Sequence, residues 1–190
     1  MNKTGRLSLI VPVLVLFIIF AFGFIAAGST LRVCKIGCEY RTINGALDDS
    51  SSGDEIRVQN GDYSESLKID KDVIIVGTNP RWVRITSPEP DSPTVIVGPS
   101  SVSVEMTNLT LTGEEDRSGK GVTVTGDSQL DLNNSRINNF RNGLTVGDSS
   151  YLKLRNSEIR STGVGATAKD KGEFVISSSK ISSAGTGIIA

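Results

Sequence analysis

From Gly121 onward, apolar residues recur at a fixed step and alternate with polar residues. Written in register, the chain reads GVTVTGDSQLDLNNSRINNFRN, GLTVGDSSYLKLRNSEIRSTGV and GATAKDKGEFVISSSKISSAGT, so that each segment begins 22 residues after the last. Five columns stay apolar throughout: Val122/Leu144/Ala166, Val124/Val146/Ala168, Leu130/Leu152/Phe174, Leu132/Leu154/Ile176 and Ile137/Ile159/Ile181. Because these positions form short alternating pairs, their period is that of a strand and not of a helix.

One such segment cannot fold alone. Its roughly six inward side chains contribute about 2 kcal/mol each, whereas ordering the backbone costs about 1 kcal/mol or more per residue. Stacked coils cover one another and pair their strands at about 4.8 Å. The pattern therefore predicts an all-β solenoid, a right-handed single-stranded parallel β-helix with about 22 residues per coil.

A leucine-rich repeat has a similar period and is the alternative fold. It requires leucine at most fixed positions and an asparagine three residues after the Leu-x-Leu pair. Here Asn134 and Asn156 follow Leu132 and Leu154 by two residues, and the apolar columns mix several residue types. Asn tolerates the left-handed conformation of a sharp corner and can bond to its equivalent one coil away, so the turn column ending in Ser178 favours the β-helix.

The first residues predict export. Lys3 and Arg6 precede an apolar run from Leu7 to Ala27 that is long enough to cross a bilayer, and the small residues at 26–29 suit a signal peptidase. Residues 1–29 are therefore either a cleaved signal peptide or a retained hydrophobic anchor helix that contacts the membrane. In both cases residues 30–190 form the β-helix domain outside the cytoplasm, secreted or membrane-anchored.

Two features mark the start of that domain. Cys34 and Cys38 lie close together in VCKIGC, and in an exported chain such a pair favours a structural disulfide over a redox pair or half of a metal site. Behind the candidate N-cap Thr42, a short amphipathic helix is expected to cover the open end of the stack. Its apolar face consists of Ile43, Ala46 and Leu47.

Composition excludes several classes of function. The net charge of −1 gives no reason to expect a nucleic-acid partner. The chain contains no histidine, which excludes Ser-His-Asp hydrolysis and the commonest zinc sites.

The segment from Cys34 to Gly77 carries motifs of a known superfamily. The order CxxGC, YxTIxxAL, GDxIxV, GxYxE and IDK resembles the N-terminal half of the pectin-lyase-like right-handed β-helix superfamily, and CxxGC is similar to its exported surface proteins in the NosD-like branch. The residues that match are Cys34, Cys38, Tyr40, Thr42, Ile43, Gly53, Asp54, Gly61, Tyr63, Glu65, Asp70, Lys71 and Gly77. The resemblance implies the fold, whereas enzymes and non-enzymes of the superfamily share these motifs.

The resemblance also implies where catalysis would lie, namely at outward carboxylates beside an Arg or Lys on adjacent coils. The GxxDFxFG signature of the pectin methylesterases is absent, and no Asp/Glu cluster matches the calcium site of the pectate lyases. The sequence therefore names no catalytic residue and favours a protein that is not an enzyme.

Outward charged columns are the candidates for a ligand face. Asp131 lies beside Lys153, and Arg136, Glu158 and Lys180 form a second column with steps of about 4.8 Å. Because opposite signs alternate, these columns predict either cross-coil ion pairs that fix the register or a saccharide groove.

Two further groups complete the candidates. Thr123, Thr145 and Thr167 form an outward hydroxyl column, which fits glycan binding or simply the β-propensity of threonine. The acidic loop Glu114, Glu115 and Asp116 is the weak candidate for a calcium ion, and no other cofactor is expected.

These observations favour a non-catalytic extracytoplasmic β-helix scaffold, with a cell-surface structural or carbohydrate-binding role. Its partners would be a polysaccharide or glycan, or another cell-surface protein. One alternative is a fragment of a polysaccharide lyase or carbohydrate esterase. Another is a coil-stacking assembly subunit, because the sequence enters a new coil at Gly187 and shows no capping segment there, which predicts self-association.

Overall fold

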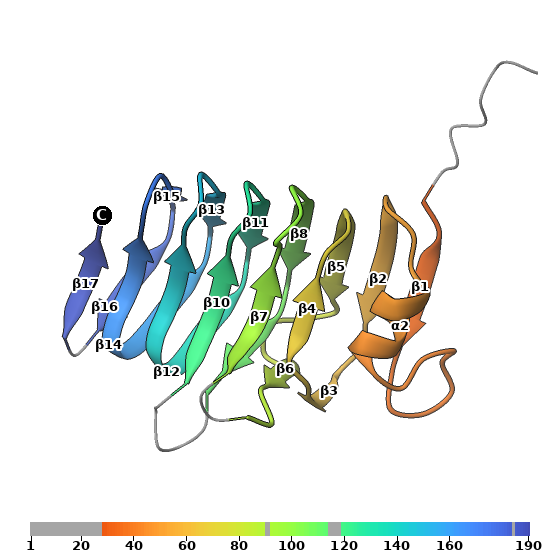
Figure 1. Cartoon of the computed structure of the whole chain (residues 1–190). Helices are drawn as coiled ribbons and strands as arrows, with labels where there is room; N and C mark the ends of the chain where they lie inside the picture. Colours follow the sequence, from red (N-terminus) through yellow and green to blue (C-terminus); the bar gives the residue numbers. More distant parts are fainter. Residues whose placement is uncertain (1–27, 90–91, 114–118, 184) are drawn as a thin grey trace, which may run out of the picture.

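The computed structural model describes residues 28–89, 92–113, 119–183 and 185–190. The chain winds through successive coils that stack along one axis, from β1 and β2 at one end to β17 at the other (Figure 1). Strands of neighbouring coils pair in parallel and in register, which confirms the predicted parallel β-helix. The expected leader lies outside the described residues up to position 27. Within the described part, no helix has the length and apolar character needed to cross a membrane.

The elements are short, and most strands have three to five residues. Their bounds are β1 Thr30–Val33, α2 Ile43–Asp49, β2 Asp54–Val58, β3 Gly61–Ser64, β4 Leu67–Ile69, β5 Val73–Gly77, β6 Val83–Thr86, β7 Pro93–Val97, β8 Ser103–Thr107, β9 Thr110–Thr112, β10 Lys120–Val124, β11 Gln129–Asn133, β12 Arg136–Val146, β13 Tyr151–Arg155, β14 Glu158–Ala168, β15 Glu173–Ser177, β16 Lys180–Ser183 and β17 Thr186–Ile189.

The coils present three outer faces. The first face is the sheet β1-β2-β5-β8-β11-β13-β15. The second face is the ladder of β3, β6, β9, the first halves of β12 and β14, and β16. The third face is the ladder of β4, β7, β10, the second halves of β12 and β14, and β17. The long strands β12 and β14 join the second and third faces, and the β12–β14 pairing is irregular between positions 138 and 142.

The core consists of the predicted apolar columns. Leu132 pairs in register with Leu154, and Leu154 with Ile176, so that each side chain lies over the next. Leu132 and Leu154 are fully buried, whereas Ile176 and Phe174 in the last complete coil are only partly buried. The columns therefore line the inside of the stack, as the alternation predicts.

The glycines that mark the repeat lie where neighbouring coils approach most closely. A Cβ atom added to Gly143 would lie 2.5 Å from the carbonyl oxygen of Gly165 and 2.8 Å from the Ile159 side chain. The same clash recurs at Gly121, 2.4 Å from the carbonyl oxygen of Gly143. No side chain fits at that separation, which explains why this column is invariant along the repeat.

The corners confirm the left-handed conformation that was expected of the asparagine column. Asn134 and Asn156 have φ values of 43° and 49°, and Ser178 at the next corner has 49°. The side-chain amide of Asn134 donates to Asn108 Oδ1 (2.6 Å), one coil earlier in the column. The Asn156 amide departs from this pattern, because it donates to Asn133 Oδ1 (3.0 Å) instead.

A serine ladder beside this corner supplies acceptors that the sequence analysis did not assign. The backbone amide of Ser135 donates to Ser157 Oγ (3.0 Å), and that of Ser157 donates to Ser179 Oγ (3.1 Å). These bonds satisfy amides that fall between two ladders, where strand pairing alone would leave them unbonded. The serines therefore hold the coils together at the corner.

The N-terminal end of the stack is closed as predicted. Cys34 and Cys38 form a disulfide with a Cα–Cα distance of 5.5 Å. Helix α2 begins after the N-cap Thr42, whose hydroxyl accepts from the Gly45 amide (3.2 Å), and it packs against β1, β2 and β4. The apolar face that was predicted for this helix is buried, namely Ile43, Ala46 and Leu47.

Charged residues of the first coil hold both ends of this helix. The Glu65 carboxylate accepts from the amides of Ile43 (3.0 Å) and Asn44 (2.8 Å), and Lys71 donates to the carbonyl oxygen of Leu47 (2.9 Å). An anion at the N-terminus and a cation at the C-terminus match the free groups and the dipole of the helix. Two of the motif residues shared with the superfamily thus have a structural role.

The last coil exposes apolar side chains. Val175, Ile188 and Ile189 each leave more than two fifths of their surface accessible. Self-association through this end stays a prediction.

Candidate functional site

Trp82 is the largest apolar side chain that the second face exposes, with 57% of its surface accessible. Its backbone is fixed on both sides, because its amide donates to the Asn79 carbonyl (3.0 Å) and its own carbonyl accepts from Gly61 (2.8 Å). Trp82 and Arg84 line a hollow of about 420 Å³, together with Asn60, Gly61, Asp62 and Arg81. An exposed ring among hydrogen-bonding groups is typical of a binding surface.

A second hollow of about 450 Å³ continues from the first along the same face. Arg84 lines both hollows, which therefore lie next to each other along the coil axis, and we call the pair the groove. The other residues of the second hollow are Thr110, Thr112, Arg136, Asn138, Asn139, Glu158 and Arg160. They come from β9, β12 and β14, where the strand alternation turns one residue in two away from the core.

The charges of this groove are only partly compensated. Arg84 pairs with Asp62 (2.7 Å), and Arg160 pairs with Glu158 (2.8 Å). Among the residues that the structure describes, no ion pair involves Arg136 or Lys180, which lie in the same column. The groove therefore keeps cations that are available to a ligand.

One polar atom of the groove is buried and has no partner. Asn138 Oδ1 is shielded from solvent and accepts no hydrogen bond within the described chain. Such an atom costs free energy unless a donor reaches it.

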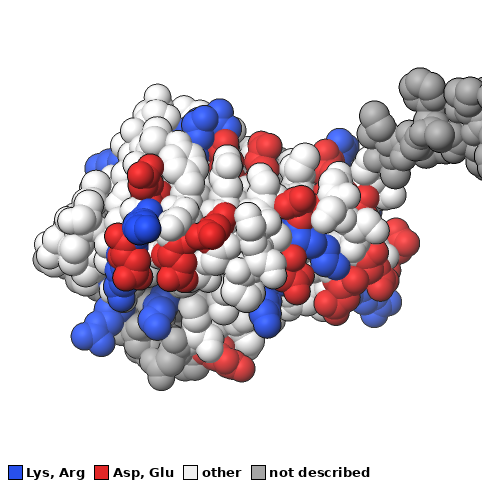
Figure 2. Space-filling model, turned by 45° about the horizontal axis from the view of Figure 1, so that its top comes forward, with Lys and Arg blue, Asp and Glu red and all other residues white. Residues whose placement is uncertain are grey.

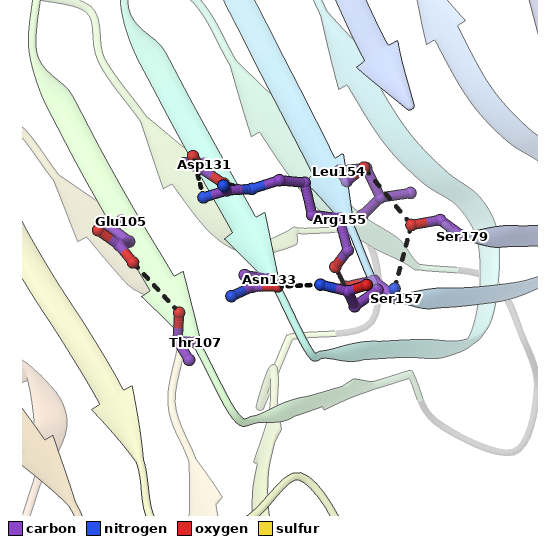
Figure 3. Close-up of polar contacts among 9 residues, drawn as sticks. Glu105, Thr107, Asp131, Asn133, Leu154, Arg155, Ser157 and Ser179 are labelled. Atoms are coloured by element: carbon purple, nitrogen blue, oxygen red, sulfur yellow. Dashed lines mark hydrogen bonds and ion pairs between the residues drawn. The ribbon is translucent and has the colours of Figure 1, made fainter. Parts of the chain in front are cut away.

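The first face presents a different constellation (Figure 3). Asp131 and Lys153 are register partners, as predicted. The ion pair, however, joins Asp131 to Arg155, with Nη2–Oδ2 and Nε–Oδ1 distances of 2.7 and 3.2 Å. The longer, forked guanidinium reaches diagonally across the ladder and binds both carboxylate oxygens, which a lysine ammonium cannot do. The predicted pairing of Asp131 with Lys153 is therefore wrong.

The second predicted column is corrected in the same way. Arg136, Glu158 and Lys180 do follow one another in register. The partner of Glu158 is nevertheless Arg160, two residues along its own strand, and not a residue of the neighbouring coil. The Asp131–Arg155 and Asp62–Arg84 pairs do join neighbouring coils, as the alternating signs predict, whereas Glu158–Arg160 lies within one strand.

The threonine column lies on the third face. Thr123, Thr145 and Thr167 are register partners, and Ile96 and Ile189 continue the column at its two ends. The candidate ligand residues thus lie on three separate faces. Only Arg136 and Glu158 line the groove, and Lys180 follows Glu158 in the same column, one coil further along.

Metal binding has little support in the described residues. No group of three or more Cys, Asp or Glu side chains is arranged to hold an ion within this part of the chain. The calcium candidates Glu114, Glu115 and Asp116 lie outside the described residues.

Comparison with known proteins agrees with this architecture. The family model described as "Right handed beta helix region" matches residues 94–190, just over half of the chain. The chain belongs to the right-handed β-helix family. No curated protein matches its sequence.

Solved structures are similar to this β-helix in fold. A pectin methylesterase in complex with a hexasaccharide has a TM-score of 0.62 at 16% identity, and pectin methylesterase PemA from Erwinia chrysanthemi has 0.60 at 14%. Each comparison covers 76% of this chain and 53% of the other, so the β-helix spans about half of their length. Identities this low show the fold alone, which agrees with the resemblance to the pectin-lyase-like superfamily.

Sequence reasoning missed much of the groove. Arg136 and Glu158 stood among the candidates, whereas Trp82, Arg84, Asn138 and Arg160 did not. The alternation in VRIT and in SEIR already turns Arg84 and Arg160 outward, so that signal was present. Trp82 lies in an irregular turn before β6, where no periodicity applies.

Proposed function

We propose that this β-helix is a non-catalytic extracytoplasmic scaffold that binds carbohydrate in the groove of its second face. The observation that carries the proposal is the pair of hollows that share Arg84, with the exposed Trp82 ring in one and Arg136, which has no ion pair among the described residues, in the other. A sugar offers an apolar ring face to the tryptophan and oxygen acceptors to the arginine.

An extracytoplasmic location is supported by the apolar N-terminal segment and by the Cys34–Cys38 disulfide, because disulfides persist in oxidising compartments. The absence of histidine removes the commonest catalytic base. On the first face, Arg155 holds both carboxylate oxygens of Asp131, an arrangement suited to structural support.

The chain contains one tryptophan, and this gives the proposal a direct test. Oligosaccharides titrated into the full chain, purified in mild detergent, should change the fluorescence of Trp82. In calorimetry, Trp82→Ala should weaken binding by about thirtyfold, as expected for a central aromatic contact. Ile74→Ala, which removes an exposed side chain of the first face, is the control and should leave affinity unchanged. A glycan panel that produces neither a fluorescence change nor heat would refute the proposal.

A carbohydrate esterase is the second candidate, because the fold is similar to that of pectin methylesterase. The carboxylates of Glu105 and Asp131 also lie on adjacent coils as register partners. If this candidate is right, the protein should release methanol from methyl-esterified pectin, and Asp131→Asn should abolish the release. Activity that Asp131→Asn leaves unchanged would point to a contaminating enzyme.

A further inference from the structure

The groove of the second face has a regular charge pattern along the coil axis. One column runs through Asp62, Arg84, Thr110, Arg136, Glu158 and Lys180, one residue for each coil. Successive members are separated by about 4.8 Å, the spacing of paired strands. A polymer lying along the groove would therefore meet one member of the column at each such step.

The ion pairs reduce this column to isolated positive charges. Asp62 neutralises Arg84, and Arg160 neutralises Glu158. Arg136 and Lys180 have no ion pair in the part of the chain that the structure describes, and the coil that carries the neutral Glu158–Arg160 pair lies between them. The free cations thus stand two coils apart, at about 9.6 Å.

This spacing selects among anionic polymers. A pyranose disaccharide in an extended β-linked chain has about the length of two coils, whereas one sugar has about the length of one. A polymer with an acid on every sugar carries two carboxylates for each free cation of the column, so half of its charge has no partner in the groove. A polymer with an acid on every second sugar would place one carboxylate at each free cation.

Uncharged groups of the groove suit the sugars in between. Asn138 follows Arg136 by two residues on β12 and lines the same hollow, although its Oδ1 is shielded from solvent. Thr112 is partly exposed there, and its hydroxyl donates to the Gly113 carbonyl and keeps lone pairs for another donor. Hydroxyl substituents of an uncharged sugar can donate to such an acceptor, and they would not compete for Arg136.

We infer that the groove binds an acidic polysaccharide in which a uronic acid alternates with an uncharged sugar. The inference rests on the proposed function and narrows its ligand class. Arg136 binds the carboxylate of one disaccharide, and Lys180, one coil beyond Glu158 in the same column, binds that of the next. Thr112 accepts from a sugar hydroxyl, and Trp82 stacks on a sugar further along the groove.

The test compares three oligosaccharides of equal length by calorimetry on the full chain in mild detergent. They are a hyaluronan fragment with an acid on alternate sugars, a polygalacturonate fragment with an acid on every sugar, and an uncharged cello-oligosaccharide. The hyaluronan fragment should bind at least tenfold more tightly than the other two. Its affinity should fall with added salt, because exposed charges are screened.

Three variants locate the effect. Arg136→Gln should weaken hyaluronan binding by about tenfold, the loss expected for one charge-assisted hydrogen bond. Glu158→Gln removes the partner of Arg160, so that three successive coils each carry a positive charge. This variant should bind polygalacturonate more tightly, and its preference for hyaluronan over polygalacturonate should be smaller. Lys153→Gln removes a charge from the first face and should leave the affinities for hyaluronan and for polygalacturonate unchanged.

The outcomes distinguish a failure of the inferred ligand class from a failure of carbohydrate binding itself. Preference for polygalacturonate or for the uncharged fragment, or equal losses in Arg136→Gln and Lys153→Gln, would overturn the inference while leaving carbohydrate binding in place. If none of the three fragments binds, and no other glycan changes Trp82 fluorescence, carbohydrate binding itself fails.

Discussion

Gly143→Ala tests whether the repeat is marked by glycine because of the distance between coils. The added Cβ would lie 2.5 Å from a backbone oxygen of the next coil and 2.8 Å from the Ile159 side chain. The oxygen belongs to a paired strand and cannot rotate away, so the backbone must shift. Overpacking of this kind costs about 1–3 kcal/mol.

Gly147→Ala is the matched control in the same coil. Its Cβ would meet only Asp170 Oδ2, at an ordinary contact distance of 3.8 Å. Both substitutions restrict the unfolded chain and gain about 0.4–1 kcal/mol from that effect. The gain cancels between the two variants, so the difference in their unfolding free energies, about 1–3 kcal/mol, reports the contact alone.

Urea unfolding of both variants, followed by circular dichroism, measures this difference. Thermal unfolding should place the melting temperature of Gly143→Ala below that of Gly147→Ala by about 2–4 °C for each kcal/mol. Equal unfolding midpoints would show that the coils can move apart at this column without loss of stability. The explanation of why glycine recurs every 22 residues would then be wrong.

Three further predictions concern the N-terminal cap. The backbone amides of Ser51 and Ser29 donate to the Asp54 carboxylate and hold its pKa below the ordinary value of 3.8. The contribution of this carboxylate to stability is therefore complete above pH 3.8 and is lost as the pH falls through the lowered pKa. Asp54→Asn should be less stable than the unchanged protein at pH 7 and should lose less stability on acidification, which urea unfolding at several pH values would measure. Replacing Cys34 and Cys38 together with serine opens a short loop and should lower the unfolding free energy by about 2 kcal/mol, whereas a reductant should have no effect on that variant. Glu65→Gln and Lys71→Met should each destabilise the protein by about 1–3 kcal/mol and raise amide exchange in α2, and unchanged exchange would contradict their role at the helix ends.

The fold could be predicted from the sequence because its determinants repeat. Leu132, Leu154 and Ile176 occupy equivalent positions, so a register that buries one buries all of them. A slip by one residue would turn every such side chain to solvent, which makes the stacking unambiguous. The disulfide and the helix face were predictable for a similar reason, because each depends on residues close together in the chain.

The site was less predictable because it depends on side-chain reach and on irregular turns. Register alone places Lys153 opposite Asp131, yet Arg155 takes the carboxylate through its longer fork. Trp82 is positioned by backbone bonds to Asn79 and Gly61, and neither contact has a periodic signal. Figure 2 shows acidic and basic side chains intermixed on the visible surface, so that no field of a single sign indicates a ligand face.

The constant step between coils has a consequence for how such a protein can change. Duplicating one 22-residue unit, for example the segment from Gly143 to Val164, would insert a complete layer whose ends match the layers on both sides. All three surfaces would lengthen together by about 4.8 Å while their existing chemistry stayed in place. The number of units therefore sets the length of each surface, and with it the length of polymer that the proposed groove would accommodate.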